Sequence, residues 1–220
     1  MIKLELNNIE FSFENILKIK SVAFHEDKLN ILKGKNASGK TTILKVIAGY
    51  SIPKTGSLHV SDPHIKVNFD DFNMKEQKKY NKFIKNNVSF IESTSIFYND
   101  SSIKQNLEYF LRINGQKYTS EKLDSFINLM NYFEIEEKLY KNISSLSKGT
   151  QQKLLVIFQL LLNRKIILFD EPTLGFDKSS VLKFFELLKN LEKTFIITTH
   201  ESNYEMISSI NEIYMEEILT

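Results

Sequence analysis

Eight residues near the start of the chain, GKNASGKT at positions 34–41, combine residue types that suit phosphate chemistry. They fit the pattern G-x-x-x-x-G-K-[ST], in which the backbone N–H groups of a tightly curled loop surround a polyphosphate. Gly34 and Gly39 permit the curl because glycine adopts backbone angles that other residues avoid. Lys40 would reach the β- and γ-phosphates, and the Thr41 hydroxyl would be a ligand of Mg²⁺. The alternative interpretation is a glycine-containing turn with a chance lysine.

A second candidate set lies in IILFDEP, residues 166–172, where four apolar residues are followed by two adjacent carboxylates. An aspartate at the carboxyl end of a strand beside a phosphate loop holds Mg²⁺, directly or through water, and we assign this role to Asp170. Glu171 is then placed to orient or deprotonate the water that attacks the γ-phosphate. Taken alone, the segment fits equally well a strand that ends in solvent. The phosphate loop upstream favours the chemical interpretation.

These side chains need a scaffold that brings distant segments together. Apolar residues that alternate with polar ones at Leu4, Leu6, Ile9 and Phe11 predict strands near the start of the chain. The apolar runs in IILFDEP and TFIITTH are typical of strands that are buried on both faces of a parallel sheet. Helical spacing is expected over three stretches, which are residues 41–50, most of 101–141, and 151–164.

Length and composition limit the classes of protein that fit. The chain has 220 residues, no cysteine and a net charge of +2. The absence of cysteine excludes disulfides and cysteine-based metal or redox sites and fits a reducing cytosol. Near neutrality gives no sign of nucleic acid as a partner. The longest apolar runs are far short of the roughly 20 residues that span a bilayer, so a membrane function would need another chain to cross the membrane.

One stretch of lysines is open to two interpretations. MKEQKKYNKFIKNN, residues 74–87, places lysines at helical spacing, and such a face fits anionic lipid or nucleic acid. It equally fits a solvated helix face opposite Phe83 and Ile84. We favour the solvated face because the whole chain is nearly neutral.

The segment SSLSKGTQQK, residues 144–153, precedes the third helical stretch, and a serine-rich helix N-cap is its ordinary interpretation. The segment lies between the phosphate loop and IILFDEP, however. With the three segments in this order, the chain resembles the nucleotide-binding subunit of ATP-binding cassette (ABC) transporters. The family signature is LSGGQ, and LSKGT stands in its place, with Lys148 for the first glycine and Thr150 for the glutamine. The resemblance implies that Ser147, Gly149 and Thr150 reach the ATP of a partner subunit.

The resemblance runs over essentially the whole chain and implies further site residues. Phe13, with Phe11 as the alternative, is expected to stack on adenine, although core packing on a strand would also explain either ring. Asp177 ends a segment similar to the family's D-loop, and His200 stands where the family has its switch histidine. Glu92 stands where the family has a glutamine that normally touches Mg²⁺, and the resemblance implies that its carboxylate is a ligand of Mg²⁺, unless the alignment is shifted by one residue. The residues implied to bind ATP in the phosphate loop are Gly34, Lys35, Asn36, Ala37, Ser38, Gly39, Lys40, Thr41 and Thr42, and Ala37 stands where the family usually has glycine.

The resemblance also implies the fold: an α/β P-loop NTPase with a mostly parallel sheet, an N-terminal antiparallel β subdomain and a helical subdomain. The core is expected at about residues 1–91 and 149–220, with the helical subdomain at about 92–148. That subdomain would dock on the membrane-spanning subunits of the transporter.

The implied activity is Mg²⁺-dependent ATP hydrolysis that powers transport, with Lys40, Glu171 and His200 as catalytic residues. Two such subunits, identical or different, would enclose ATP between them, and the chain would be cytoplasmic, on the inner face of the cell membrane. The short chain and its variant signature favour an export or self-protection system.

Two alternatives of another class remain. Soluble members of the same ATPase family act on DNA or ribosomes, but they usually carry long coiled-coil insertions, zinc modules or two cassettes, which this sequence lacks. An ATP-binding module without hydrolysis is disfavoured because Lys40, Asp170, Glu171 and His200 are all present.

Overall fold

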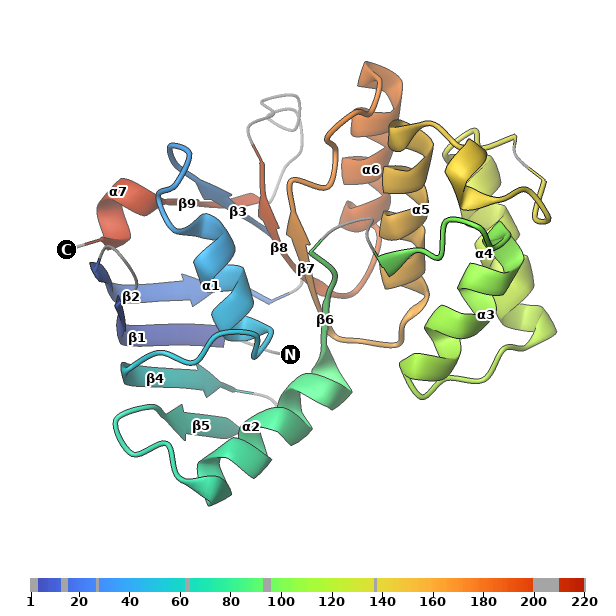
Figure 1. Ribbon diagram of the computed structural model, residues 1–220. Helices are drawn as coiled ribbons and strands as arrows, with labels where there is room; N and C mark the ends of the chain where they lie inside the picture. Colours follow the sequence, from blue (N-terminus) through green and yellow to red (C-terminus); the bar gives the residue numbers. More distant parts are fainter. Residues whose placement is uncertain are drawn as a thin grey trace. The chain divides into compact units, whose positions relative to one another are not determined.

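The computed structural model is shown in Figure 1. It describes residues 4–12, 16–26, 28–61, 64–92, 96–136, 138–199 and 210–219. The chain forms two compact units, which are described one at a time. The first consists of Met1–Phe90, Arg164–Glu171 and Leu188–Thr220, and the second of Ile91–Asn163 and Pro172–Leu187.

The first unit contains a four-stranded antiparallel sheet with the strand order β2-β1-β4-β5. Its strands are β1 (Leu4–Ser12), β2 (Ile16–Phe24), β4 (Thr55–Val60) and β5 (Ile65–Asn68). A register shift between Asn7 and Glu10 explains why buried positions change from Leu4 and Leu6 to Ile9. Such a bulge adds one residue and restores the apolar face to the core side. The expected N-terminal antiparallel region is confirmed.

The second sheet of this unit is entirely parallel, with the order β6-β7-β8-β3-β9. Its strands are β3 (Leu29–Lys33), β6 (Val88–Phe90), β7 (Ile166–Asp170), β8 (Thr194–Thr198) and β9 (Ile210–Tyr214). In parallel strands the carboxyl ends meet at one edge, where open α/β sheets bind their ligands. The ends of β3, β7 and β8 therefore bring the phosphate loop and the acidic pair to the same edge.

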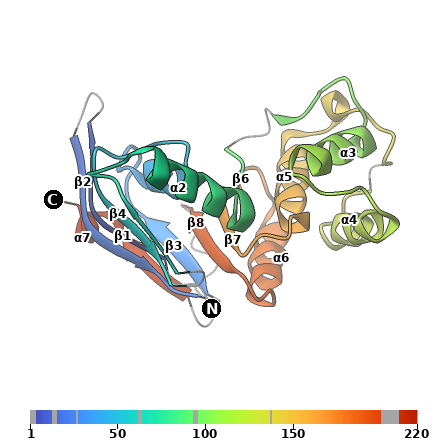
Figure 2. The ribbon, with the colours of Figure 1, turned by 90° about the horizontal axis from the view of Figure 1, so that it is seen from below.

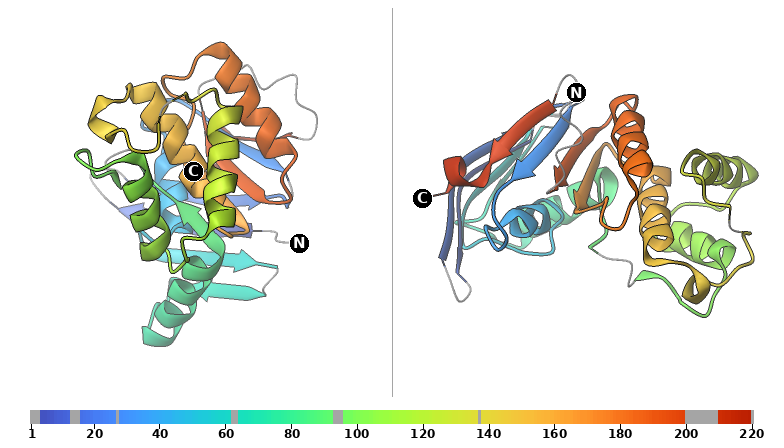
Figure 3. Two further views of the ribbon diagram at one scale, coloured as in Figure 1. Left: turned by 90° about the vertical axis from the view of Figure 1, so that its right-hand side faces the viewer. Right: turned by 90° about the horizontal axis from the view of Figure 1, so that it is seen from above.

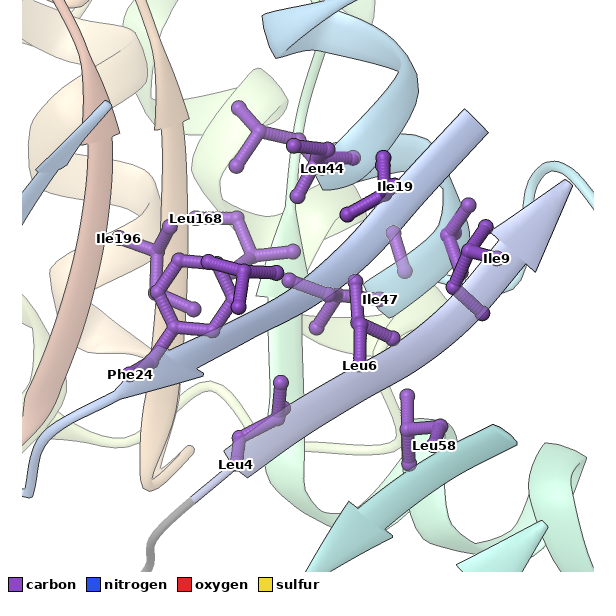
Figure 4. Close-up of a cluster of buried hydrophobic side chains, with 14 of the residues drawn as sticks. Leu4, Leu6, Ile9, Ile19, Phe24, Leu44, Ile47, Leu58, Leu168 and Ile196 are labelled. Atoms are coloured by element: carbon purple, nitrogen blue, oxygen red, sulfur yellow. The ribbon is translucent and has the colours of Figure 1, made fainter. Parts of the chain in front are cut away.

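The helices of the first unit are α1 (Lys40–Ile47), α2 (Met74–Asn87) and the short α7 (Met215–Ile218). Leu44 and Ile47 of α1 belong to one buried cluster that also holds residues of both sheets, as the close-up in Figure 4 shows. Figure 2 shows α2 along the antiparallel sheet. Its Tyr80 and Phe83 are buried, while most of its lysines are exposed, as both interpretations of this face require.

The second unit is helical, with α3 (Ile103–Ile113), α4 (Ser120–Tyr132), the single 3₁₀ turn η2 (Ile143–Ser145), α5 (Lys148–Leu161) and most of α6 (Lys178–Lys189). Serine and threonine begin α3, α4 and α5 as N-caps, which is why these helices start where they do. Phe158 of α5 contacts the rings of Phe97, Phe110 and Phe126 at centroid distances of 5.1–5.7 Å. The helices α3, α4 and α5 are green to gold in Figure 3.

The expected helical subdomain, residues 92–148, lies within this second unit, which extends further and includes α5. The aromatic contacts of Phe158 tie α5 to α3 and α4. The boundaries of the subdomain therefore remain a prediction. Within the described ranges, none of the helices is long and apolar enough to cross a membrane.

Candidate functional site

The loop at residues 34–39 connects β3 to α1 and is closely fitted to its surroundings. Gly34 has φ 156°, and a Cβ there would lie 2.8 Å from the Met215 side chain and 2.9 Å from Ser38 Oγ. Gly39 has φ 99°, and a Cβ there would lie 2.9 Å from Leu17. Both positions therefore require glycine, as the phosphate-loop pattern predicts.

Lys40, the first residue of α1, is 7% exposed and folds back over the loop. Its ammonium donates hydrogen bonds to the carbonyl oxygens of Gly34 at 2.7 Å and Lys35 at 3.0 Å. These hydrogen bonds hold the ammonium inside the curl of the loop. In the predicted complex a polyphosphate oxygen would lie beside it. A charged donor with two neutral acceptors gains strongly from an anionic partner.

Further features of the loop fit an anion. No side chain caps α1 at Gly39, and its first turn contains no acidic residue, so the N–H groups at this helix end are open to an anionic ligand. The Ser38 hydroxyl is buried and has no hydrogen-bond partner in the described part of the chain. Buried hydroxyls nearly always have a partner, and an anion in the loop would accept a hydrogen bond from this one.

The other predicted loop residues differ in exposure and in backbone conformation. Lys35 and Asn36 are exposed, and Thr42 is half-buried. Ala37 has φ 60°, a left-handed conformation that alanine adopts at a cost. The loop keeps a backbone that suits glycine although alanine stands there.

Asp170 ends β7 beside the loop, and its two carboxylate oxygens accept from two hydroxyls. Thr41 Oγ1 donates to Oδ2 at 2.8 Å, and Thr198 Oγ1 donates to Oδ1 at 2.5 Å. Hydroxyl and carboxylate oxygens are the ligands that Mg²⁺ prefers, so this pair fits the predicted metal site. Glu92, the third predicted ligand, is exposed and belongs to the other unit, and its part in metal binding stays a prediction.

Glu171 follows directly and has φ 46°, a rare conformation for a residue with a side chain. Its backbone N–H donates to Thr198, at 3.1 Å to the carbonyl oxygen and 3.0 Å to Oγ1. Thr198 therefore touches both acidic residues, and sequence reasoning missed it. The available signal was a threonine near the end of an apolar strand.

The second unit carries the segment predicted to act as a signature. Ser147 is the N-cap of α5: its Oγ accepts from the Thr150 N–H at 3.1 Å and lies 2.9 Å from Thr150 Oγ1. A Cβ on Gly149 would lie 2.5 Å from the Gly175 carbonyl oxygen. The backbones of the two segments pass so closely that only glycine fits at position 149.

Asp177 is the last residue before α6 and caps that helix. Its carboxylate accepts from the Ser180 N–H at 2.9 Å and the Ser180 hydroxyl at 2.8 Å, and Lys153 Nζ lies 3.3 Å away. These interactions hold the pKa of Asp177 well below its usual value, and the hydrogen bonds from Ser180 lower it more than Lys153 does. The carboxylate is 62% exposed, so it remains accessible at the surface.

Two predicted site residues, Phe13 and His200, lie outside the described residues. Phe11, the alternative to Phe13, is buried in the core cluster, which does not fit a ring that stacks on a nucleotide base.

Comparisons with known proteins agree on one family. The sequence pattern of the family described as ABC transporter matches residues 17–174. A probable ABC transporter ATP-binding protein of Mesomycoplasma hyorhinis is 30% identical over 98% of this chain and 89% of its own length. The chain spans only 44% of a putative ABC transporter ATP-binding protein of Clostridium tetani, at 26% identity over 91% of this chain.

Solved structures show the same fold. A putative ABC transporter ATP-binding protein of Pyrococcus furiosus superposes with a TM-score of 0.77 at 20% identity, covering 99% of this chain and all of that one. A bacterial ABC transporter cassette, solved as a dimer, gives a TM-score of 0.74 at 25% identity over 98% of this chain and 95% of its own. The α/β P-loop fold predicted from the sequence is confirmed, and this chain belongs to the ABC transporter family.

Proposed function

We propose that this chain binds ATP together with Mg²⁺ and hydrolyses it to power a membrane transporter whose spanning subunits are separate chains. The observation that carries the proposal is the 2.8 Å hydrogen bond between Thr41 of the phosphate loop and Asp170 at the end of β7. These residues are 129 positions apart in the sequence, and the parallel sheet unites them.

In this proposal the loop and Lys40 bind the phosphates. The N–H groups at the start of α1 and the Lys40 ammonium face the β- and γ-phosphates, and the Ser38 hydroxyl donates a hydrogen bond to them. Thr41 and Asp170 would hold Mg²⁺, which neutralises the charge that develops on the phosphate oxygens. Glu171 orients the attacking water and accepts its proton.

The second unit would serve a second cassette. We propose that Ser147, Gly149 and Thr150 approach the γ-phosphate bound by a partner subunit, with Asp177 nearby. The dimeric cassette structure, at 25% identity, supports this arrangement. Phe13, Glu92 and His200 keep the roles that the resemblance implies: adenine stacking, Mg²⁺ contact and γ-phosphate contact.

The partner in the membrane would dock on the helical unit. The resemblance to the family supports this docking role, and with such a partner the chain would work at the inner face of the cell membrane.

Nucleotide titration of matched lysine variants tests the binding step. Lys40→Ala removes the ammonium that lies against the loop carbonyl oxygens, and we expect it to abolish measurable ATP binding. Lys45→Ala, on the last turn of the same helix, is the control and should bind like the parent. Equal affinity of Lys40→Ala and the parent would contradict the phosphate-loop assignment.

A further inference from the structure

Thr198 ends β8 and pairs with Asp170 of β7 in the parallel register. Its side chain is fully buried. A buried hydroxyl has one hydrogen to donate and two lone pairs to accept with, and it is costly unless these are used. Valine has nearly the same shape and suits a buried strand better. The hydroxyl therefore calls for an explanation beyond packing.

Two hydrogen bonds of this hydroxyl explain its presence. Its hydrogen goes to Asp170 Oδ1 at 2.5 Å, and its oxygen accepts the Glu171 N–H at 3.0 Å. A single side chain thus joins the two adjacent acidic residues. Neither contact involves the phosphate loop.

The first contact fixes the orientation of the Asp170 carboxylate. Thr41 occupies Oδ2 and Thr198 occupies Oδ1, so the two hydroxyls hold the carboxylate from both oxygens. Without the Thr198 hydroxyl, the hydrogen bond from Thr41 to Oδ2 is the one that the described residues still give this carboxylate, and its rotation about the Cβ–Cγ bond is less restrained. Hydrogen bonds to ligating carboxylates orient them for a metal ion.

The second contact acts on the backbone of Glu171. With φ 46°, this residue is in a conformation that persists only where its surroundings impose it. The bond from its N–H to Thr198 Oγ1, together with the one to the Thr198 carbonyl oxygen, supplies that restraint. The backbone conformation decides the direction in which the Glu171 side chain leaves the chain.

We propose that Thr198 is a positioning residue for ATP hydrolysis: its hydroxyl orients Asp170 for Mg²⁺ and holds Glu171 in the backbone conformation that catalysis needs. The inference rests on the proposed ATPase function. It predicts that loss of the hydroxyl lowers kcat and weakens the response to Mg²⁺, while the KM for ATP stays near the parent value because the phosphate loop is intact.

Three variants of the full chain test this role. Thr198→Val removes the hydroxyl and keeps the shape, and Thr198→Ser keeps the hydroxyl. Thr194→Val, at the opposite end of β8 and equally buried, controls for valine in this strand. Measured quantities are kcat and KM for ATP, the Mg²⁺ concentration that half-saturates binding of a fluorescent ATP analogue, and the urea midpoint of the ligand-free protein.

We expect Thr198→Val to lower kcat by about tenfold or more and to raise the half-saturating Mg²⁺ concentration several-fold, as the loss of hydrogen bonds to a charged group implies. Thr198→Ser should stay within about threefold of the parent, and Thr194→Val should match it. If Thr198→Val does not fold, Thr198→Ala replaces it in the comparison with serine.

Parent-like kcat and Mg²⁺ response in Thr198→Val would overturn the inference, as would equal losses in the valine and serine variants. A parent chain that neither binds nor hydrolyses ATP would instead overturn the proposed function. In that case the urea midpoints still decide whether the hydroxyl restrains the two acidic residues, because serine should preserve the midpoint and valine should lower it.

Discussion

Two residues of the candidate site, Ala37 and Glu171, have left-handed backbone angles of 60° and 46°. Within the described ranges only Asn8 and Glu134 share this feature among residues other than glycine. Strain of this kind tends to concentrate at functional sites, where the surroundings hold a conformation that the chain would otherwise leave. At Ala37 the strain arises because alanine has a Cβ atom, and substitution by glycine would relieve it.

Ala37→Gly should raise the free energy of unfolding by up to about 1 kcal/mol, because glycine adopts this φ without a steric penalty. The same change at Ala48, a buried residue with φ −79° at the end of α1, relieves no strain and removes a buried methyl group, so it should lower the free energy of unfolding. Urea unfolding of both variants measures the contrast. Destabilisation by Ala37→Gly as large as that by Ala48→Gly would show that position 37 is not strained.

Single residues also show what a local pattern can predict. The spacing of Gly34, Gly39, Lys40 and Thr41 predicts a phosphate loop, and the structure places these residues where β3 gives way to α1, while their part in ATP binding stays a prediction. Thr198 belongs to no such pattern, because its importance depends on β7 and β8 pairing in one register. The spacing of residues within one segment cannot predict contacts between strands that are distant in the sequence.

At the scale of elements, the first turn of α5 packs closely against the backbone of the segment that precedes α6. Gly149→Ala would place a methyl carbon 2.5 Å from the Gly175 carbonyl oxygen. We expect a loss of about 1–3 kcal/mol in unfolding free energy, as for other overpacked sites. Lys148→Ala, one residue earlier and exposed, should change it by less than about 0.5 kcal/mol. Equal stability of the two variants in urea would refute the steric account.

The cap of α6 should make stability depend on pH. The pKa of Asp177 is lowered in the folded chain by Ser180 and Lys153, relative to about 3.9 when unfolded. The ionised cap therefore contributes its full stabilisation above pH ~4 and loses it progressively as the pH falls below that value. Asp177→Ala should cost about 1 kcal/mol at pH 7, and the difference from the parent should shrink at pH 3.

Asp177→Asn separates the charge from the cap. Asparagine can still accept from the Ser180 N–H, but it does not titrate. Its stability relative to Asp177→Ala should stay constant between pH 7 and pH 3, as followed by urea unfolding. If the difference between the parent and Asp177→Ala is the same at both pH values, the carboxylate charge is not involved in the cap.

The long helices and apolar strands could be predicted because their periodicity is strong. Helical spacing anticipated α1, α3, α4 and α5, and continuous apolar runs anticipated β7 and β8. The strand β9, with the sequence INEIY, was not anticipated, since it has little apolar pattern of its own. It exists because it pairs with β3, about 180 residues earlier in the chain.

At the scale of the whole molecule, the two units carry complementary chemistry. The first unit holds the phosphate loop and the acidic pair, and the second holds Ser147 and Asp177. In the proposed function, neither surface is complete until two cassettes meet around ATP. The central claim is therefore that one chain turns over ATP through an ATP-dependent pairing with another cassette.

The most direct measurement is size-exclusion chromatography of Glu171→Gln at high protein concentration with Mg²⁺ and ATP, combined with an ATP turnover assay. The amide keeps the shape of the carboxylate but cannot accept the proton of the attacking water. It also removes a negative charge beside the phosphates, which lowers electrostatic repulsion. The control is Glu192→Gln, which makes the same change at an exposed position outside the candidate site.

We predict that Glu171→Gln binds ATP with parent affinity, loses turnover by about 100-fold or more, and elutes as a dimer with ATP but as a monomer with ADP. The Glu192→Gln control should hydrolyse ATP at the parent rate. Turnover by Glu171→Gln at the parent rate, or a variant that stays monomeric with ATP while the parent dimerises, would contradict the account.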